Sequence, residues 1–215
     1  MNKRDLAEII GIMLGDGNLY ITNHGTICQI RISGHKNDDR DYLLKWVKPL
    51  FEKTFDVKVY EKNHKIKNEM FICINSKKVA RILIDYGFPS GRKSKNKVKI
   101  PDWILSNNLF LKRCIRGLID TDGFVYPVNL NSSYPRIGFV SGIDSLRQSF
   151  SLAMKILGFH PTKWTIRKSG WTKKFSIGQC TLGRKIEVLR YFNEIEFKNP
   201  KYINNFIRFR KAPLV

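Results

Sequence analysis

The sequence has no long apolar run and few acidic residues. No stretch of about 18 apolar residues occurs, so hydropathy predicts no transmembrane helix. The first ten residues, MNKRDLAEII, carry acidic side chains within their apolar part and lack a small-residue cleavage site, so they do not resemble a secretory signal. We therefore expect a cytoplasmic protein that does not bind membranes.

Cysteine is also scarce, and the chain has no C-x-x-C pair. The four cysteines stand far apart in the sequence, at Cys28, Cys73, Cys114 and Cys180. This spacing fits neither a zinc site nor a disulfide framework, and a cytoplasmic chain keeps such thiols reduced. The four histidines are scattered as well. Buried thiols and surface imidazoles are the simplest interpretation of both residue types.

The abundant feature is positive charge. Lysine and arginine total 39 against 18 acidic residues, which gives a net charge of +21. Residues 1–105 carry 20 basic and 12 acidic side chains, and the remainder carries 19 and 6, so both parts are positive. A folded chain with this much self-repulsion is typical of a protein whose partner is a polyanion such as nucleic acid. The alternative is a basic surface without a special partner.

The sequence also contains an internal repeat. Asp16-Gly17 recurs as Asp122-Gly123, 106 residues later, and Tyr20 recurs as Tyr126 at the same offset. Two apolar segments recur near the same offset, Ile30–Ile32 as Ile137–Phe139 and Phe71–Ile74 as Phe175–Gly178. A repeat of this length predicts two similar structural units.

Apolar periodicity predicts the same order of elements in both units: helix, two strands, helix, two strands, helix. In the first unit the predicted helices and strands are 5–15, 18–22, 26–33, 39–55, 57–62, 69–75 and 77–86. In the second they are 110–121, 124–128, 134–140, 143–157, 163–168, 172–179 and 182–192. We therefore predict an α+β fold of two pseudo-symmetric αββαββα halves, at residues 1–90 and 106–215, joined by a basic linker at 91–105. Two antiparallel sheets with helices on one face would form a long saddle.

The first helix of each unit ends in an unusual way. Each contains a glycine, Gly11 or Gly117, which costs about 1 kcal/mol against alanine and suggests that another helix approaches closely. Each is followed by an aspartate and then a glycine, which permits a left-handed helix end. Asp16 and Asp122 are unfavourable there, because the carboxyl end of a helix already carries partial negative charge. Bound divalent cations would relieve that conflict. The alternative is a pair of Asp-Gly turns that merely end helices.

These helix ends resemble a known motif. Ile115–Gly123 closely resembles the LAGLIDADG motif, and Ile9–Gly17 is a looser match with Leu14 in place of the first aspartate. The chain is thus similar to the single-chain, two-motif LAGLIDADG homing endonucleases of the intron-encoded type. The resemblance extends to G-H-K-N-D after the second strand and to K-I-P-D-W-I before the second motif. It implies paired motif helices at the centre and sheets that form a DNA-binding saddle.

The resemblance also implies site residues. Asp16 and Asp122 would bind catalytic Mg²⁺ or Mn²⁺, with the backbone carbonyls of Gly15 and Thr121 completing the coordination, and Asp120 would be structural. Basic residues would order water and steady the transition state, and the best matches are Lys97, Lys99 and Lys201. Each of these lysines could instead be an ordinary phosphate contact.

The free faces of the sheets would bind the major groove of DNA. Alternation along the strands nominates these contact residues: Tyr20, Thr22, Gln29, Arg31, Ser33, Tyr60, Lys62, Lys67, Tyr126, Arg136, Lys163, Thr165, Arg167, Trp171 and Lys173. Arg31, Arg136 and Arg167 are the expected base readers, because guanidinium pairs with guanine through two hydrogen bonds. Any of them could be a solvated strand residue, since alternation is normal in sheets.

The implied function is a site-specific, metal-dependent endonuclease that cuts double-stranded DNA. Because the two halves differ in their predicted contact residues, we expect an asymmetric target and a monomeric protein. Two alternatives remain open: an RNA maturase on the same fold that binds intron RNA, and a DNA-binding regulator without catalysis.

Overall fold

The structure is a computed structural model that describes residues 1–22, 25, 27–127, 135–169 and 175–210. The chain begins with a buried helix and continues through two hairpins with helices between and after them. The elements of this half are α1 (Lys3–Leu14), β1 (Gly17–Ile21), β2 (Cys28–His35), α2 (Arg40–Tyr42), the π-helical segment η1 (Leu43–Val47), α3 (Lys48–Phe55), β3 (Tyr60–Asn63), β4 (Glu69–Asn75) and α4 (Lys77–Asp85).

The second half repeats this order after a short helix, α5 (Asp102–Leu105), in the connecting segment. Its elements are α6 (Asn108–Asp122), β5 (Gly123–Pro127), β6 (Pro135–Ser141), α7 (Asp144–Ile156), β7 (Thr165–Ser169), β8 (Phe175–Leu182), α8 (Lys185–Glu194) and α9 (Pro200–Arg210). Asn107 caps α6 by accepting hydrogen bonds from two backbone amides at its start.

The sheets have the same topology in both halves. Each has four antiparallel strands, in the order β1-β2-β4-β3 and β5-β6-β8-β7. The central pairs join strands of different hairpins, β2 with β4 and β6 with β8. The repeat in the sequence therefore corresponds to a repeat in topology, and the predicted α+β architecture of two matching halves is confirmed.

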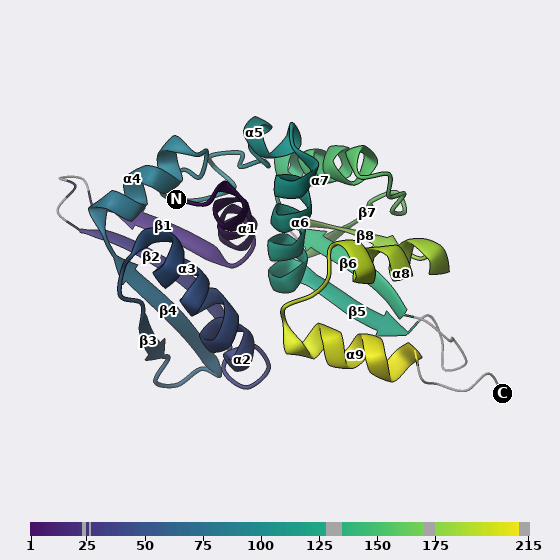
Figure 1. The fold of residues 1–215 in the computed structure, drawn as a ribbon, viewed down its shortest axis with the longest axis horizontal. Helices are drawn as coiled ribbons and strands as arrows, with labels where there is room; N and C mark the ends of the chain where they lie inside the picture. Colours follow the sequence, from purple (N-terminus) through teal and green to yellow (C-terminus); the bar gives the residue numbers. More distant parts are fainter. Residues whose placement is uncertain (23–24, 26, 128–134, 170–174, 211–215) are drawn as a thin grey trace.

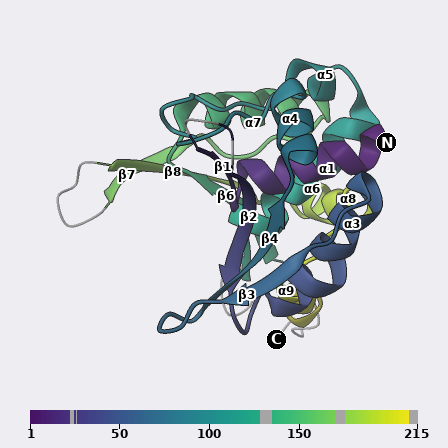
Figure 2. The same cartoon turned by 90° about the vertical axis from the view of Figure 1, so that its left-hand side faces the viewer.

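Each sheet has one buried face. Along β2 the even-numbered residues from Cys28 to Ile32 are buried, whereas the residues between them are partly exposed. Figure 2 shows the strands extending to one side of the molecule, with α1, α3 and α8 on the other. The apolar face of each sheet is thus covered by helices, as the alternation predicts.

The helices α1 and α6 lie side by side between the two sheets (Figure 1). A methyl group on Gly117 would lie 2.6 Å from the Glu8 carbonyl oxygen, and one on Gly11 would overlap the Cys114 carbonyl. The expected close approach at both glycines is confirmed. The interface also holds a buried ion pair, because Glu8 on α1 accepts hydrogen bonds from Arg116 on α6.

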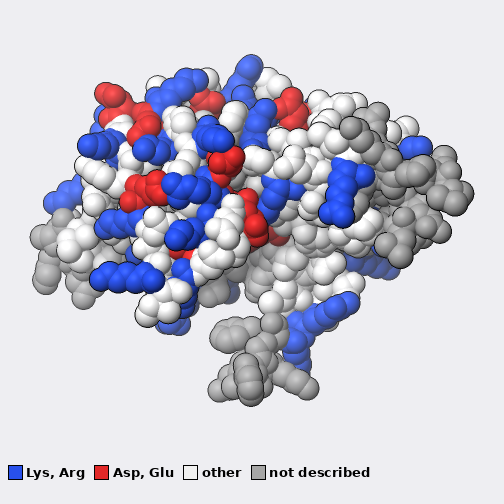
Figure 3. Space-filling model, turned by 90° about the horizontal axis from the view of Figure 1, so that it is seen from below, with Lys and Arg blue, Asp and Glu red and all other residues white. Residues whose placement is uncertain are grey.

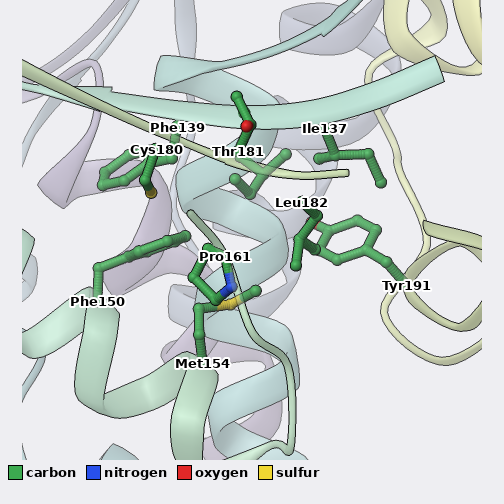
Figure 4. A pocket seen from close by; sticks show the side chains of 11 residues that line it. Ile137, Phe139, Phe150, Met154, Pro161, Cys180, Thr181, Leu182 and Tyr191 are labelled. Carbon is green, nitrogen blue, oxygen red and sulfur yellow. The ribbon is translucent and has the colours of Figure 1, made fainter. Parts of the chain in front are cut away.

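Apolar and aromatic side chains fill the core of both halves, continuously through the α1–α6 interface. In the second half, Phe139 and Phe150 stack at 4.3 Å between their ring centroids. Beside them is a cavity of about 10 Å³, lined by residues such as Ile137, Met154 and Leu182 (Figure 4). This volume is a packing gap at the limit of a single water molecule, not a ligand site.

The structure differs from the predicted elements in a few places. Residues 40–55 are helical, as expected, but include a π-helical turn at η1. Two helices were not predicted, α5 in the linker and α9 near the end of the chain. The strand predicted at residues 172–179 begins outside the described residues. Its described part is β8, which continues to Leu182. In the described ranges, no helix has the length and apolar character needed to cross a membrane.

Candidate functional site

The two motif aspartates lie where α1 and α6 end side by side. Asp16 follows the end of α1, and Asp122 is the last residue of α6. Gly15 is in close contact with the other helix, because a methyl group there would overlap Thr121 Oγ1 and lie 3.6 Å from Asp122 Oδ2. The glycine at this position therefore allows the two carboxylates to approach each other.

The electrostatics of this pair match the expected conflict. Burial raises the pKa of Asp16 to about 7, and the neighbouring Asp122 carboxylate adds to the rise. Burial also raises the pKa of Asp122 to about 6, against the opposing charge of Lys93. Two carboxylates are thus held in a partly desolvated position where a cation would favour their charged forms.

The glycines after the aspartates serve another purpose than the one expected. Neither Gly17 nor Gly123 has a positive φ, so neither forms a left-handed helix end. A side chain on Gly17 would overlap the Met13 backbone, and one on Gly123 would overlap the Ile119 carbonyl. Glycine is required there because the strand turns back tightly against the helix that precedes it.

A lysine from the connecting segment reaches the pair. The Lys93 Nζ donates hydrogen bonds to the Leu14 carbonyl, at 3.1 Å, and to the Gly15 carbonyl. Burial lowers the pKa of Lys93, while Asp122 and Asp16 oppose that shift. The lysine therefore places a positive charge beside both aspartates.

The lysine beside the aspartates is not one of the two that the sequence nominated in this segment. Lys97 is exposed in a left-handed turn, and the Lys99 ammonium lies 3.0 Å from the exposed Asp102 carboxylate. Lys93 occupies the position that the sequence assigned to these two. The motif match pointed to this segment but could not fix which lysine of the cluster turns inward.

The third predicted lysine, Lys201, does lie near the aspartates. Its charge opposes the rise in the pKa of Asp16, and its Nζ lies 2.6 Å from Asp39 Oδ1. Burial disfavours ionisation of Asp39, but hydrogen bonds from Lys201, Asn199 and the His35 amide outweigh it and lower the pKa of this carboxyl. Asp39 and Asn199 were not identified from the sequence.

Asp120, expected to be structural, is buried in the second half. Its Oδ2 accepts a hydrogen bond from the Lys198 backbone amide at 2.9 Å. Burial raises the pKa of Asp120 to about 7. Its contacts tie α6 to the segment before α9.

The oxygens at the helix ends fit a hard divalent cation. Asp16 and Asp122 supply two carboxylates, and the Gly15 carbonyl, which the sequence nominated, already accepts a hydrogen bond from an ammonium group. Among the described residues, no group of three or more histidine, cysteine, aspartate or glutamate side chains could hold a metal. Carboxylates with backbone carbonyls and water are the ligand set that Mg²⁺ accepts.

The predicted contact residues of the first sheet share its outer face. Strand register aligns Tyr20 with Gln29, and Arg31 with Cys73 and Tyr60. Ser33 aligns with Phe71 and Lys62, and Lys67 is exposed in the turn that follows β3. Thr22 follows β1 with the same alternation.

The strand register adds two residues to this face that were not predicted. Phe71 lies under the Arg31 guanidinium, 4.2 Å from its ring centroid, and Asn75 aligns with Gln29.

The second sheet is arranged in the same way. Tyr126 aligns with Arg136, Thr165 with Gln179, and Arg167 with Ile177, all on the outer face. Lys163 is exposed just before β7. Trp171 and Lys173 lie outside the described residues. Gln179 was missed because neighbouring glycine and serine residues obscure the alternation of its strand.

Basic side chains are widespread on the surface. Seen from below (Figure 3), lysine and arginine are scattered over the molecule, most densely on its left-hand side, with acidic residues interspersed among them. Figure 2 shows that β7 and β8 project from the body, and Arg167 and Lys168 are exposed on this arm. The outer faces therefore combine aromatic, polar and cationic groups.

Two curated proteins match part of the chain. The replication factor C small subunit of Methanocaldococcus jannaschii is 32% identical over 133 residues, which are 58% of this chain and 7% of that protein. The tRNA-splicing ligase RtcB of Pyrococcus furiosus is 31% identical over 131 residues, 56% of this chain and 13% of that protein. The chain thus spans a small part of the curated relatives that it matches. No family model matches the chain.

Solved structures match nearly the whole chain. The homing endonuclease I-DmoI, in complex with DNA and Mn, superposes with a TM-score of 0.60 at 16% identity, covering 91% of this chain and 98% of that one. The LAGLIDADG homing endonuclease I-LtrWI, bound to target DNA, gives 0.56 at 14% identity, covering 94% and 88%. The meganuclease I-SmaMI, also bound to DNA, gives 0.57 at 11% identity, covering 95% and 86%. The chain therefore has the fold of the LAGLIDADG homing endonucleases.

Proposed function

We propose that this protein is a site-specific endonuclease that hydrolyses both strands of a long DNA duplex with Mg²⁺ or Mn²⁺. The observation that carries the proposal is the pair of buried aspartates at adjoining helix ends, with Lys93 beside them. Such a like-charge pair is destabilising by itself, and sequences usually accept such a conflict at a functional site. The fold, with structural neighbours that are themselves DNA-bound homing endonucleases, supports the same conclusion.

The protein groups have distinct tasks in this proposal. Asp16 and Asp122 hold the cation, with the Gly15 and Thr121 carbonyls as further ligands. When bound, the cation activates water and offsets the charge that develops on the phosphate. Lys93 contributes positive charge from a partly desolvated position, where it stabilises an anionic transition state more strongly than in water. When the hydrogen bond from Lys93 to the Gly15 carbonyl breaks, that carbonyl oxygen becomes available to the cation.

The outer sheet faces bind the duplex. Exposed residues of β1–β4 and β5–β8 form two surfaces, one on each side of the paired helices. Arg31, Arg136 and Arg167 are positioned on these faces to read bases, whereas exposed lysines contact phosphates. Because the two faces present different side chains, the proposed target is asymmetric and one chain suffices to bind it.

The proposal is tested by incubating the protein and Mg²⁺ with a library of random duplexes and mapping the ends produced. We expect double-strand cleavage at a discrete set of sequences. Asp16→Asn and Asp122→Asn should each reduce double-strand cleavage by roughly 100-fold or more, because each removes a charged ligand. Lys93→Met should also reduce the rate, and more strongly than Lys97→Met does.

The matched control is Asp85→Asn, at an exposed aspartate at the end of α4, which should cut as the parent does. A nicked product from either site variant agrees with the proposal, since one strand can still be cut. Full double-strand cleavage by Asp16→Asn or Asp122→Asn contradicts it. A larger loss in Lys97→Met than in Lys93→Met restores the lysine choice made from the sequence. Duplex binding without cleavage by the parent favours the regulator alternative.

A further inference from the structure

The site lysine of the second half is held by an acidic residue of the first half. Asp39 lies just before α2, and its Oδ1 accepts a hydrogen bond from Lys201 Nζ at 2.6 Å. Its Oδ2 accepts one from the His35 backbone amide at 2.9 Å. The Asp39 side chain is 13% exposed and the Lys201 side chain 30%, so this ion pair is partly shielded from solvent. The contact is therefore a fixed link and not a surface pair between mobile side chains.

A buried amide supports the link. Asn199 is fully buried, and its Nδ2 donates to Asp39 Oδ1 at 3.0 Å and to the Asp120 carbonyl at 3.0 Å. Its Oδ1 accepts a hydrogen bond from the Lys201 backbone amide at 3.2 Å. The side chain of Lys201 is thus tied to Asp39 and its backbone to Asn199, and these two groups are themselves hydrogen-bonded. A network satisfied at each of these atoms is pre-organised and resists rearrangement.

The two site lysines differ in what they contact. Lys93 donates to backbone carbonyls beside the aspartates, and its charge acts on both Asp16 and Asp122. Lys201 donates to a carboxylate, and its charge is felt at Asp16. Lys93 follows the first half and Lys201 belongs to the second, so their positions correspond in the repeat. The repeat is therefore symmetric in fold and asymmetric in how its lysines are restrained.

We propose that Asp39 is a positioning residue that holds Lys201 beside Asp16 and keeps it from pairing directly with that carboxylate. The inference rests on the proposed function, because Lys201 acts on the cleavage of DNA. A lysine side chain has several rotatable bonds, and without a partner it would spread over many rotamers or move onto Asp16, on which its charge already acts. In that position it would compete with the cation. Because the charge of Lys201 acts on Asp16, whereas that of Lys93 acts on both aspartates, the loss of Asp39 should affect one of the two strands.

The test uses a duplex cut by the parent protein, with a different fluorescent label on each strand. Asp39→Asn keeps the size of the side chain and an oxygen for the His35 amide, but removes the charge that holds Lys201. We expect it to slow the cutting of one strand about tenfold, the effect of one charge-assisted hydrogen bond, and the other less than about twofold. It should also raise the Mn²⁺ concentration needed for half-maximal cutting of that strand. Asp39→Glu should restore part of the rate.

The matched control is Asp41→Asn, which removes an exposed aspartate that pairs with Lys45 at 2.8 Å. It should leave both strand rates unchanged. Equal slowing of both strands by Asp39→Asn, or no slowing of either, overturns the proposal, because a general loss of structure or an idle ion pair would give these results.

A second measurement does not depend on DNA. In proton–nitrogen NMR spectra of lysine ammonium groups, a held and shielded Lys201 should give a signal that is absent from Lys201→Met. We expect Asp39→Asn to lose this signal and Asp41→Asn to keep it. An unchanged signal in Asp39→Asn overturns the positioning role. If the parent cuts no duplex, the proposed function fails, whereas the spectra still show whether Asp39 holds Lys201.

Discussion

At the scale of single residues, the site is a balance between burial and charge. Asp16 and Asp122 are carboxylates whose neutral forms the fold favours, with Lys93 as a partial counterweight. Protons and divalent cations therefore compete for the same oxygens. Lowering the pH should weaken cation binding as each carboxylate gains its proton. Each of these residues is a cation ligand when it is charged and a tolerable buried group when it is neutral. The stability of the folded protein should therefore depend on pH.

The metal-free protein should become less stable as the pH rises. The folded pKa values of about 7 and 6 exceed the ordinary value of 3.8, so between these limits the folded state binds more protons than the unfolded chain. The free energy of unfolding therefore falls as the pH rises from about 4 to 7 and stays low above. Asp16→Asn removes the share of this penalty that belongs to Asp16 and should be about 1–3 kcal/mol more stable than the parent near pH 8.

Chemical denaturation in EDTA at several pH values measures this effect. Asp102→Asn, at an exposed aspartate, is the control and should follow the parent. Adding Mg²⁺ should stabilise the parent more than Asp16→Asn, because binding to the folded state alone raises its stability. A variant less stable than the parent near pH 8 would show that the Asp16 charge is already compensated by its surroundings.

At the scale of elements, the helix pair fixes the site. The contacts at Gly11 and Gly117 are between backbones, which cannot move aside as a flexible side chain can. Gly117→Ala would gain about 1 kcal/mol of helix propensity. The added methyl group would still lie 2.6 Å from the Glu8 carbonyl oxygen, so α1 and α6 must separate. We expect a net loss of about 2 kcal/mol or more in the free energy of unfolding.

Gly142→Ala is the matched control for this substitution. It lies in an exposed position, and its added methyl group would meet no neighbour nearer than 3.7 Å, the Ser176 carbonyl oxygen. Urea unfolding of both variants measures the difference. Equal stability of the two would mean that the helix pair can open without cost, and the approach of the aspartates would then not depend on these glycines.

The order of helices and strands was predictable because it depends on local patterns. Periodicity marked the four helix–hairpin units, and Asp-Gly at the helix ends marked the site. The pattern did not predict α5, a single turn within the linker, or α9, where apolar residues such as Tyr202 and Phe206 follow Pro200. Nor did it give the reason for Gly17 and Gly123, because a tight strand contact and a left-handed turn both select glycine.

The site network was harder to predict than the fold. Asp39 and Lys201 are 162 residues apart, so their pairing follows from how the two halves dock and not from any local spacing. Lys93 stands in a run of five basic residues, of which periodicity cannot select one when the segment has no regular structure. Asp39 and Lys93 lie outside the helices and strands, so no local pattern marks them, whereas Lys201 near the start of α9 was nominated from its place in the second half.

At the scale of the whole molecule, the charge of +21 is spread over both halves of one fold. The outer sheet faces hold six described basic residues among the predicted contacts: Arg31, Lys62, Lys67, Arg136, Lys163 and Arg167. On a random duplex the arginines have no matching bases to read, so each of the six can neutralise one phosphate, and binding then releases the counterions of about six phosphates. Affinity for any duplex should then depend steeply on salt, and this dependence is separate from cleavage.

We expect the logarithm of the association constant to fall with the logarithm of salt concentration with a slope of roughly −5 for a random duplex in EDTA. Lys62→Met and Lys163→Met, on opposite sheets, should each make the slope shallower by about 1. Lys53→Met, on α3 in the helix layer, is the control and should leave the slope unchanged. Fluorescence anisotropy titrations at several salt concentrations measure all three. An equal change in Lys53→Met would show that the duplex is held by diffuse surface charge, and the sheet faces would lose their assignment as the DNA-binding surface.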